Sequence, residues 1–265
     1  MSPRLTFAAL LLLTTLMPAG AALHAAGAPA DARAIVDKSL KTMVFEQPSI
    51  SASVTLKDVD QGGNTRVRTI AVKSKKDSQG LSKTILHFTQ PTDLKGTGFL
   101  VLERQGVQDE QFLYLSATKK TKRIRSDQQD SAFMGTQYSY ADLQNRDVED
   151  NTYALKGEEK LDRFDCYVIE STPKRPSEEQ YSRTLSWIAK STFVPLRMQM
   201  FDKSGVMVKV FTVKDVKVVD GLYVVTDSIM KNVKKNRHTE MVVEDLKTGE
   251  SLSDDLFTVS RLEKM

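Results

Sequence analysis

The spacing of apolar residues changes near residue 50 from a helical period to a strand period. Between residues 31 and 48, apolar side chains recur every three or four positions. They are Ile35, Val36, Leu40, Met43 and Val44. This spacing is typical of one face of an amphipathic helix, and Asp31 and Pro48 are suitable residues to start and stop it. We therefore expect one N-terminal helix ahead of the rest of the fold.

From Ile50 onward, apolar and polar residues alternate, which is the period of a strand with one buried face. The alternation recurs in segments 50–58, 65–75, 81–90, 97–105, 110–117, 122–126, 165–171, 183–190, 195–202, 207–216, 222–233 and 238–246. Turn residues such as Asp220-Gly221 separate many of them. No helix of crossover length lies between neighbouring segments, so parallel pairing is disfavoured. The pattern predicts a mainly β protein with one large, strongly curved antiparallel sheet of about 10–12 strands.

The segment DSAFMGTQYSYAD, residues 130–142, follows neither period, although it contains Phe133, Met134, Tyr138 and Tyr140. A connecting segment is normally polar because it faces water, so these side chains need a buried position. A curved sheet of this size encloses more room than its own side chains fill. We therefore expect this segment and the N-terminal helix to form a lid over a hydrophobic cavity on the open side of the sheet.

The run PLRMQMFD places Leu196, Met198 and Met200 on one strand face, with Arg197 and Gln199 on the other. Methionine is unbranched and polarizable, so a surface rich in it adapts to ligands of variable shape. We predict that these three residues contact a hydrophobic ligand. The alternative for each residue is an ordinary core position.

The run KKTKRIR, residues 119–125, concentrates positive charge ahead of the aromatic segment. In a hairpin strand, Lys122 lies on one side, and Arg123 and Arg125 lie on the other. A planar guanidinium binds phosphate bidentately, and a basic surface steers an acidic partner toward it. We predict that these three residues dock an acidic partner or an anionic head group. The alternative is a solvated turn.

The first residues have the three-part layout of a secretory signal peptide. Arg4 precedes an apolar run of about thirteen residues, and small residues follow Pro18. The run is shorter than the roughly 20 residues that a membrane-spanning helix needs, and no cysteine follows it to take a lipid. We expect a cleaved signal peptide at 1–21, a flexible mature N-terminus at 22–30, a β domain at 31–265, and a soluble, unlipidated protein in the periplasm.

The composition argues against several functions. Loss of the signal peptide lowers the formal net charge of +4 by one, and basic residues are not interleaved with aromatic ones as in a nucleic-acid-binding surface. Cys166 is the single cysteine and lies in a strand-like run, while His87 and His238 lie in separate runs. Motifs for a hydrolytic triad, a metal site or a phosphate-binding loop are missing. We expect no nucleic-acid partner, no metal, no cofactor and no enzymatic activity.

Four blocks of the sequence resemble the LolA-like family called outer membrane lipoprotein-sorting protein. They are QPTDLKGTGFLVLE, QFLYLSATKKTKRIRSDQQDSAFMGTQYSYADL, WIAKSTFVPLRMQMFDKSGVMVK and SDDLFTVSRL. The second block is the most specific, because the family pattern there runs from Y-L-P through R-R-I into F-M-G-S and an aspartate-leucine. This sequence has Ser116, Lys122 and Thr136 where the family commonly has proline, arginine and serine.

The resemblance covers roughly residues 35–265 and has consequences for fold and partners. It implies an unclosed β-barrel with a helical lid over a hydrophobic cavity, as in periplasmic carriers of lipoproteins. It also implies a partner, because relatives are similar to proteins that act beside RND-type exporters of the inner membrane.

Together these features predict a monomeric carrier that binds the acyl chains of a lipoprotein or lipid-like molecule for transfer toward the outer membrane. The alternative is a lipid- or protein-sensing regulatory module in the cell envelope. A carrier should release its cargo to membranes, whereas a sensor should retain the cargo until a partner arrives.

Overall fold

A computed structural model of the chain describes residues 31–144 and 148–264. These residues belong to one compact unit, Asp31–Met265. The predicted signal peptide at 1–21 and the predicted flexible stretch at 22–30 lie outside the described residues. Within the described ranges, no helix combines the length and the apolar character needed to cross a membrane.

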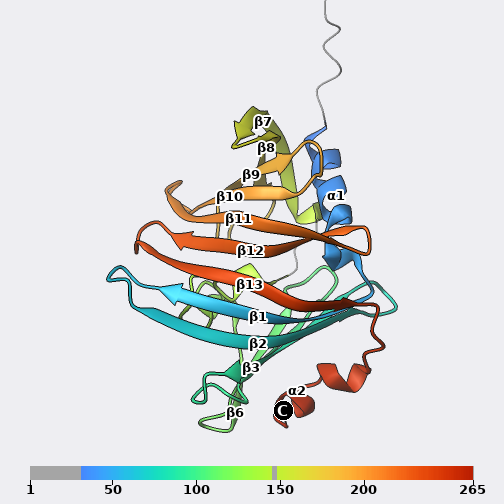
Figure 1. Cartoon of the computed structure of the whole chain (residues 1–265), viewed down its shortest axis with the longest axis vertical. Coiled ribbons are helices and arrows are strands. Elements are labelled where there is room, and N and C mark those ends of the chain that lie inside the picture. The colour runs from blue at the N-terminus through green and yellow to red at the C-terminus, as the bar shows by residue number, and fades with distance from the viewer. Residues whose placement is uncertain (1–30, 145–147, 265) are drawn as a thin grey trace, which may run out of the picture. The chain divides into compact units, whose positions relative to one another are not determined.

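One antiparallel sheet of 13 strands makes up most of the fold (Figure 1). The strands are β1 (Ser49–Val59), β2 (Thr65–Lys76), β3 (Ser82–Gln90), β4 (Gly98–Leu102), β5 (Glu110–Leu115), β6 (Lys120–Arg123), β7 (Asn151–Leu161), β8 (Phe164–Pro173), β9 (Arg183–Ala189), β10 (Pro195–Phe201), β11 (Met207–Val219), β12 (Leu222–Asn232) and β13 (Arg237–Thr248). Their order across the sheet is β6-β5-β4-β3-β2-β1-β13-β12-β11-β10-β9-β8-β7. The sheet is not closed into a barrel, which confirms the predicted architecture.

The strand that the alternation does not reveal is β7, which forms one edge of the sheet. Its second half, residues 156–161, is mostly charged and contains Gly157, and a bulge lies between Leu155 and Gly157. Charges and bulges discourage an edge strand from pairing with other chains. They also erase the apolar pattern by which inner strands are recognised, so the sheet has 13 strands rather than the predicted 10–12.

The chain must travel from the edge strand β6 to the opposite edge strand β7. The described part of this connection contains η2 (Ser126–Gln128), η3 (Phe133–Gly135), η4 (Ala141–Leu143) and η5 (Val148–Asp150). In Figure 1 it runs behind β13 and β1, inside the curve of the sheet. We call residues 126–144 the lid. A connection on this path faces the interior, which accounts for its apolar composition.

The main core lies between the lid and the concave face of the sheet. Its buried members come from the lid, from both halves of the sheet and from two loops next to strands: Leu56, Ile70, Phe88, Phe99, Val101, Leu113, Ile124, Phe133, Tyr138, Tyr140, Tyr181, Met200 and Met230. The Phe133 ring lies 5.2 Å from that of Phe99, 5.6 Å from that of Tyr140 and 5.9 Å from that of Phe88, between centroids. Aromatic pairs at such distances add to the free energy gained from burial alone.

The N-terminal helix α1 (Ala32–Thr42) begins at the predicted N-cap, since the Asp31 side chain accepts a 3.0 Å hydrogen bond from the Arg33 N–H. The short helix η1 (Val44–Glu46) follows it. The buried positions of α1 are Ala32, Ile35 and Ser39, a stripe at helical spacing. Leu40 lies one residue beyond that stripe and is 44% exposed, so it is not part of the buried face of the helix.

The C-terminal segment covers part of the convex face through η6 (Asp254–Phe257) and α2 (Val259–Leu262). Phe257 and Leu262 join Ile85 and Leu100 in a buried cluster of their own. Gly98 permits this contact, because a Cβ at that position would lie 2.6 Å from Cδ1 of Leu262. The absence of a side chain in β4 therefore fixes where the last helix docks.

Gly98→Ala should lower the free energy of unfolding by about 1–3 kcal/mol, because overpacking displaces the fully buried Leu262 side chain. Denaturant unfolding measures this change. Leu262→Ala removes the obstructing atoms, so the double variant should lose less stability than the two single variants together. Strict additivity would show that the two residues do not compete for this space.

Candidate ligand-binding cavity

A cavity of about 660 Å³ opens between α1, η1, the lid and the strands β10, β11 and β12, and its wall also includes Lys76, Gly80, Ser82 and Glu103 at the β2–β3 turn and the end of β4. We call it the ligand cavity. Its apolar and aromatic lining residues are Leu40, Phe45, Tyr138, Val148, Tyr181, Met198, Met200, Phe211 and Met230. Leu40 and Phe45 are exposed and mark its mouth, where Lys76 and Glu46 form a 3.2 Å ion pair. The volume falls in the range of roughly 300–1,000 Å³ that small-molecule sites occupy.

Two of the three predicted strand residues line this cavity, namely Met198 and Met200 of β10. Leu196 packs on the other face of the sheet, in a cluster with Trp187. The prediction that Leu196 shares a face with the two methionines is therefore wrong. A β-bulge just before Arg197 interrupts the alternation of β10, and one inserted residue reverses the side on which a side chain lies.

The sequence did not single out the residues that complete the methionine wall. Phe211 of β11 pairs directly with Met198 of β10 and with Met230 of β12. Large, flexible side chains thus stand side by side on three neighbouring strands. A comparison of strand registers would have revealed them, because directly opposed residues share one face of the sheet.

The four apolar residues of the lid take different positions. Phe133 is 1% exposed and Tyr140 is 8% exposed, and both belong to the core cluster. Met134 is partly buried against the same cluster, and Tyr138 belongs to the cluster and also lines the ligand cavity. All four residues therefore hold the lid onto the sheet, and Tyr138 is in addition part of the cavity wall.

One buried polar cluster ties the lid to the centre of the sheet. Asp58 of β1 accepts hydrogen bonds from the Gln137 side-chain amide (3.0 Å) and from the Thr239 hydroxyl (2.9 Å). The same hydroxyl accepts the Gln137 backbone N–H at 2.8 Å. Arg68 lies under the lid, with one nitrogen 3.5 Å from the place of a Cβ on Gly135. Burial lowers the pKa of Arg68, and the Asp58 carboxylate opposes that change.

A second buried cluster ties the other end of the lid to β11. Lys209 and Asp142 form a 2.6 Å ion pair, with side chains 8% and 7% exposed. Asp142 also accepts hydrogen bonds from the Tyr181 hydroxyl and the Ser139 backbone N–H, each 2.8 Å long. A buried ion pair needs such additional hydrogen bonds to offset the cost of removing both charges from water.

Tyr138 brings a polar atom into this apolar surrounding. Burial raises the pKa of Tyr138 well above its usual value, and the neighbouring Ser228 hydroxyl opposes the rise. Neither hydroxyl has a hydrogen-bond partner of normal geometry among the described residues. Both oxygens are fully enclosed, and Ser228 does not line the ligand cavity, so each hydroxyl has the other as its polar neighbour inside the protein.

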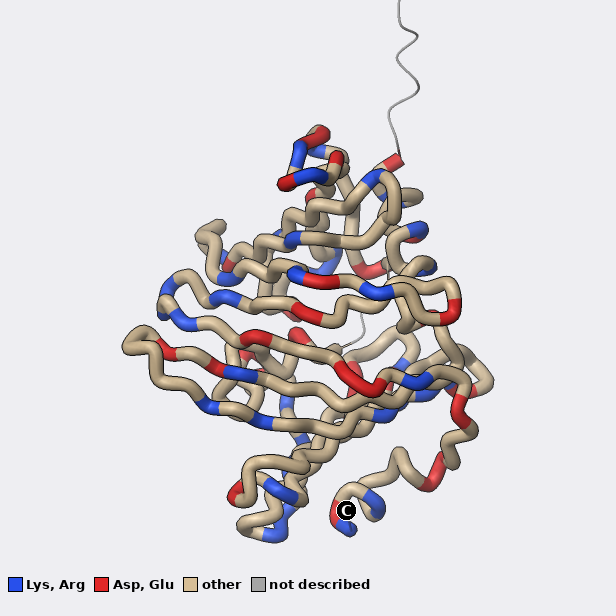
Figure 2. The backbone as a smooth tube through the Cα atoms, viewed as in Figure 1, with Lys and Arg blue, Asp and Glu red and all other residues tan. Residues whose placement is uncertain are grey.

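The predicted docking residues lie at the end of the sheet that carries the β5–β6 hairpin. Arg123 is 3.0 Å from Glu110, Arg125 is 3.4 Å from Asp127, and Lys122 is exposed. Figure 2 shows residues of both charge signs scattered along the backbone. Both guanidinium groups already have a carboxylate partner, and none of the three residues lines the ligand cavity. Their docking role stays a prediction.

The cysteine and the two histidines of the β domain do not form a common site. Cys166 is fully buried, and burial raises the pKa of its thiol. His87 lies on β3 and His238 on β13. His238 lies 3.4 Å from Glu240 on the same strand. This arrangement brings neither histidine to the thiol.

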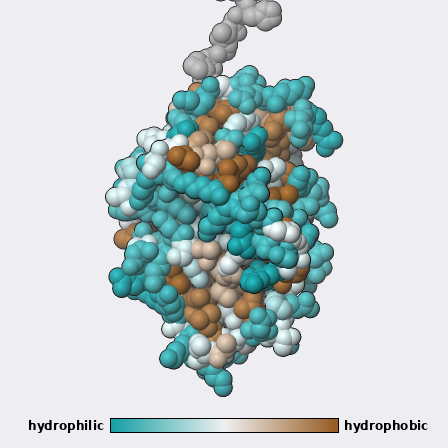
Figure 3. Space-filling model, turned by 90° about the vertical axis from the view of Figure 1, so that its left-hand side faces the viewer, coloured by the Kyte–Doolittle hydropathy of each residue, from teal (hydrophilic) through white to brown (hydrophobic). Residues whose placement is uncertain are grey.

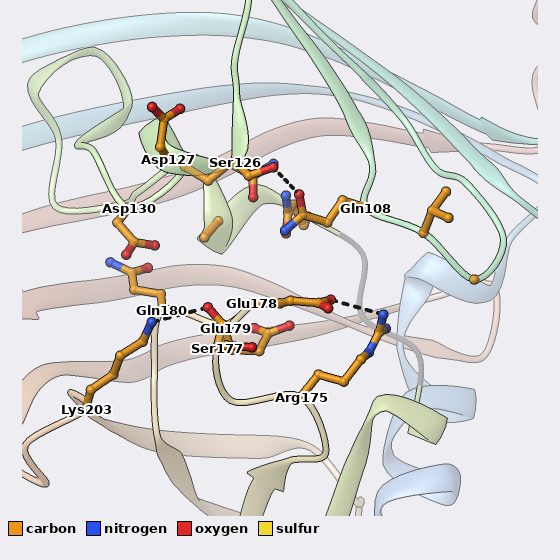
Figure 4. A pocket seen from close by; sticks show the side chains of 15 residues that line it. Gln108, Ser126, Asp127, Asp130, Arg175, Ser177, Glu178, Glu179, Gln180 and Lys203 are labelled. Atoms are coloured by element: carbon orange, nitrogen blue, oxygen red, sulfur yellow. Dashed lines mark hydrogen bonds and ion pairs between the residues drawn. The ribbon is translucent and has the colours of Figure 1, made fainter.

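A second cavity, of about 610 Å³, lies among the loops that precede β5 and follow β6 and β8 (Figure 4). Its walls carry Gln108, Ser126, Asp127, Asp130, Arg175, Ser177, Glu178, Glu179, Gln180 and Lys203. Arg175 and Glu178 form a 3.0 Å ion pair across part of the wall. Walls of amides and charges do not suit an acyl chain, so the ligand cavity remains the better candidate for one.

The fold and the ligand cavity together define a class: a binding protein built on one unclosed antiparallel sheet with a lid inside its curve. A family model with the description "-like: Uncharacterized protein" matches residues 80–264. No curated protein matches the chain.

Solved structures extend the comparison over most of the chain. A DUF1329 family protein from Desulfovibrio piger is 29% identical with a TM-score of 0.82, covering 87% of this chain and 98% of that one. A domain from Vibrio parahaemolyticus, named as an outer membrane lipoprotein-sorting protein, is 26% identical with a TM-score of 0.80, covering 88% and 98%. A LolA superfamily protein from Nitrosomonas europaea shares the fold at 21% identity, with a TM-score of 0.70 and coverage of 86% and 98%. The neighbours of this chain thus include LolA superfamily and outer membrane lipoprotein-sorting domain proteins, which confirms the resemblance seen in its sequence.

Lys209→Met should lower the free energy of unfolding by about 3–5 kcal/mol, because it leaves the Asp142 carboxylate buried without a cation. Adding Asp142→Asn should restore most of this loss, since a neutral amide still accepts the Tyr181 hydrogen bond. Lys234→Met, in an exposed ion pair with Asp202, serves as the control and should change stability by less than about 1 kcal/mol. Equal unfolding free energies for Lys209→Met and its double variant would contradict the role of the pair.

Proposed function

We propose that this protein is a periplasmic carrier that binds the acyl chains of a lipoprotein or lipid-like molecule and takes them toward the outer membrane. The observation that carries this proposal is the ligand cavity of about 660 Å³, walled by Met198, Met200, Phe211 and Met230. Transfer of a methylene from water contributes about 0.8 kcal/mol. Roughly ten methylenes would contribute about 8 kcal/mol before ordering costs, enough for reversible binding.

The mouth of the cavity suits the entry of an apolar chain. Phe45 is 67% exposed and Leu40 is 44% exposed, and both line the cavity. A chain can therefore pass from one apolar surface to the next on its way inside. Binding and release of this kind require no catalytic residue, and the proposal includes no enzymatic step.

The relatives support the class of cargo, and the sequence supplies the compartment. The Vibrio parahaemolyticus domain is named for lipoprotein sorting and is 26% identical. The proposal adds a cleaved signal peptide at 1–21, a flexible mature N-terminus at 22–30 and a monomeric β domain at 31–265. Its partner is an inner-membrane exporter of the RND type, with Arg123, Arg125 and Lys122 as docking residues.

A lipid- or protein-sensing module is the second candidate. The two buried polar clusters, at Asp58 and at Asp142, would let the lid change between discrete positions when a ligand competes with them. Transfer to empty vesicles separates the two functions. A carrier gives up its cargo to vesicles alone, whereas a sensor keeps it until the partner is added.

Met198→Trp should lower the uptake of a fluorescent fatty acid about tenfold or more, because the larger ring fills space that the acyl chain needs. Leu196→Trp is the matched control, since it enlarges a side chain of the same strand on the opposite face. Circular dichroism should show an intact sheet for both variants. Undiminished uptake by Met198→Trp, or equal loss in both variants, would argue against this cavity as the binding site.

A further inference from the structure

One arginine is buried under the lid without a hydrogen-bonded partner for most of its guanidinium group. Arg68 of β2 is 6% exposed, and its Nε and Nη1 atoms have no hydrogen-bond partner among the described residues. Asp58 and Asp93 attract the guanidinium through their charge and Arg66 repels it, but neither aspartate accepts a hydrogen bond from those two atoms. A buried charge is normally paired, because removing it from water is costly. The position of Arg68 therefore does not serve the stability of the closed fold.

The cover over Arg68 is a narrow hairpin of the lid. The Phe133 backbone N–H donates a 2.7 Å hydrogen bond to the Tyr138 carbonyl, which closes the hairpin at its base. We call residues 135–137 the lid tip. Nη2 of Arg68 lies 3.5 Å from the place of a Cβ on Gly135, and Gly135 itself is exposed. The lid is thus thin where it covers the guanidinium.

The base and the tip of this hairpin are held by different kinds of contact. At the base, the Phe133 ring is 1% exposed and packs in the core cluster. At the tip, the Gln137 side chain donates a hydrogen bond to Asp58, and the Gln137 backbone N–H donates one to the Thr239 hydroxyl. Water can replace these hydrogen bonds at little net cost, whereas a core ring has no such replacement. The lid tip can therefore open while the base stays packed.

The lid tip lies at an end of the sheet that water reaches. Asp58 is near the end of β1, Arg68 is near the start of β2 and Thr239 is near the start of β13, at the strand ends opposite α1 (Figure 1). Figure 3 shows this side of the molecule, where hydrophilic side chains surround smaller apolar areas. When the lid tip opens, water solvates the Arg68 guanidinium. This solvation lowers the free energy of opening, and an apolar residue at position 68 would not provide it.

We propose that the unpaired guanidinium of Arg68 keeps the lid tip poised to open. Residues 135–137 open as a local unit while Phe133 and the rest of the lid stay packed in the core, and Arg68 sets how often they do so. This inference goes beyond the proposed carrier function and does not depend on it, because its test needs no ligand.

Hydrogen exchange of the Gln137 backbone N–H measures opening of the lid tip, and exchange of the β12 amides measures unfolding of the sheet. In the unaltered protein, the Gln137 amide should exchange about a hundredfold faster than those of β12, or faster still. Arg68→Met should slow the Gln137 amide about tenfold, since opening no longer solvates a charge. Arg66→Met, which removes an exposed arginine two positions away on the same strand, should change this rate less than about twofold.

The same experiment contains the outcomes that would overturn the proposal. Equal slowing by Arg68→Met and Arg66→Met would show that the charge of this strand end acts as a whole, and not the buried guanidinium. No slowing by Arg68→Met would show that opening of the lid tip does not solvate Arg68. Exchange of Gln137 as slow as that of the β12 amides in the unaltered protein would show that the lid tip does not open locally.

Thermal stability tests whether Arg68 is unpaired. Arg68→Met should leave the midpoint of unfolding equal or raise it, because it removes a buried charge without a partner. Arg237→Met should lower the midpoint by about 5 °C, because it takes the ion-pair partner 3.4 Å away from the buried Asp58 carboxylate. Opposite signs for these two arginine-to-methionine changes distinguish an unpaired charge from a paired one. An equal loss in both variants would refute the premise of the proposal.

Discussion

The fold depends on one topological constraint, which is the path of the chain between the two edges of an unclosed sheet. The consecutive strands β6 and β7 lie at opposite edges of the 13-strand order. Their connection has to pass over the whole sheet, and it passes inside the curve. A segment on that path is surrounded by side chains from both halves of the sheet, so Phe133 packs against Phe88 and Phe99 and becomes core.

The same constraint accounts for the polar groups under the lid. A connection of short helical turns leaves backbone and side-chain polar groups without the partners that a sheet or a long helix provides, and those groups must be paired when they are buried. Asp58 and Thr239 accept hydrogen bonds from Gln137 near the middle of the lid. Asp142, near the end of the lid, forms an ion pair with Lys209. Apolar packing holds the lid inside the curve of the sheet, and these hydrogen bonds and ion pairs fix its position there. The space that remains between the lid and α1 is the ligand cavity.

Much of the fold follows from local patterns in the sequence, and the exceptions have physical causes. A period of two reveals strands that bury one face, and the ring-rich segment 130–142 indicates a cover because exposed rings are unfavourable. The edge strand β7 could not be predicted in this way, because the charges that protect it from aggregation also interrupt its alternation of apolar and polar residues. Leu196 is misplaced because a bulge changes the face of a strand without changing its composition. The polar anchors at Asp58 and Lys209 could not be predicted, since each depends on residues far apart in the chain that only the folded sheet brings together.

The burial of the lid bears on how a ligand could enter the cavity. A polar residue in place of Phe133 would destabilise the core, because that ring is 1% exposed and surrounded by other rings, so Phe133 does not act as a movable gate. The mouth beside Leu40 and Phe45 is already open to an apolar chain, so entry requires no movement of the lid. At the inner end of the ligand cavity, an acyl chain would contact the two tyrosines Tyr138 and Tyr181. Because both belong to the buried core, the depth to which a chain can enter depends on how firmly the lid is packed against the sheet.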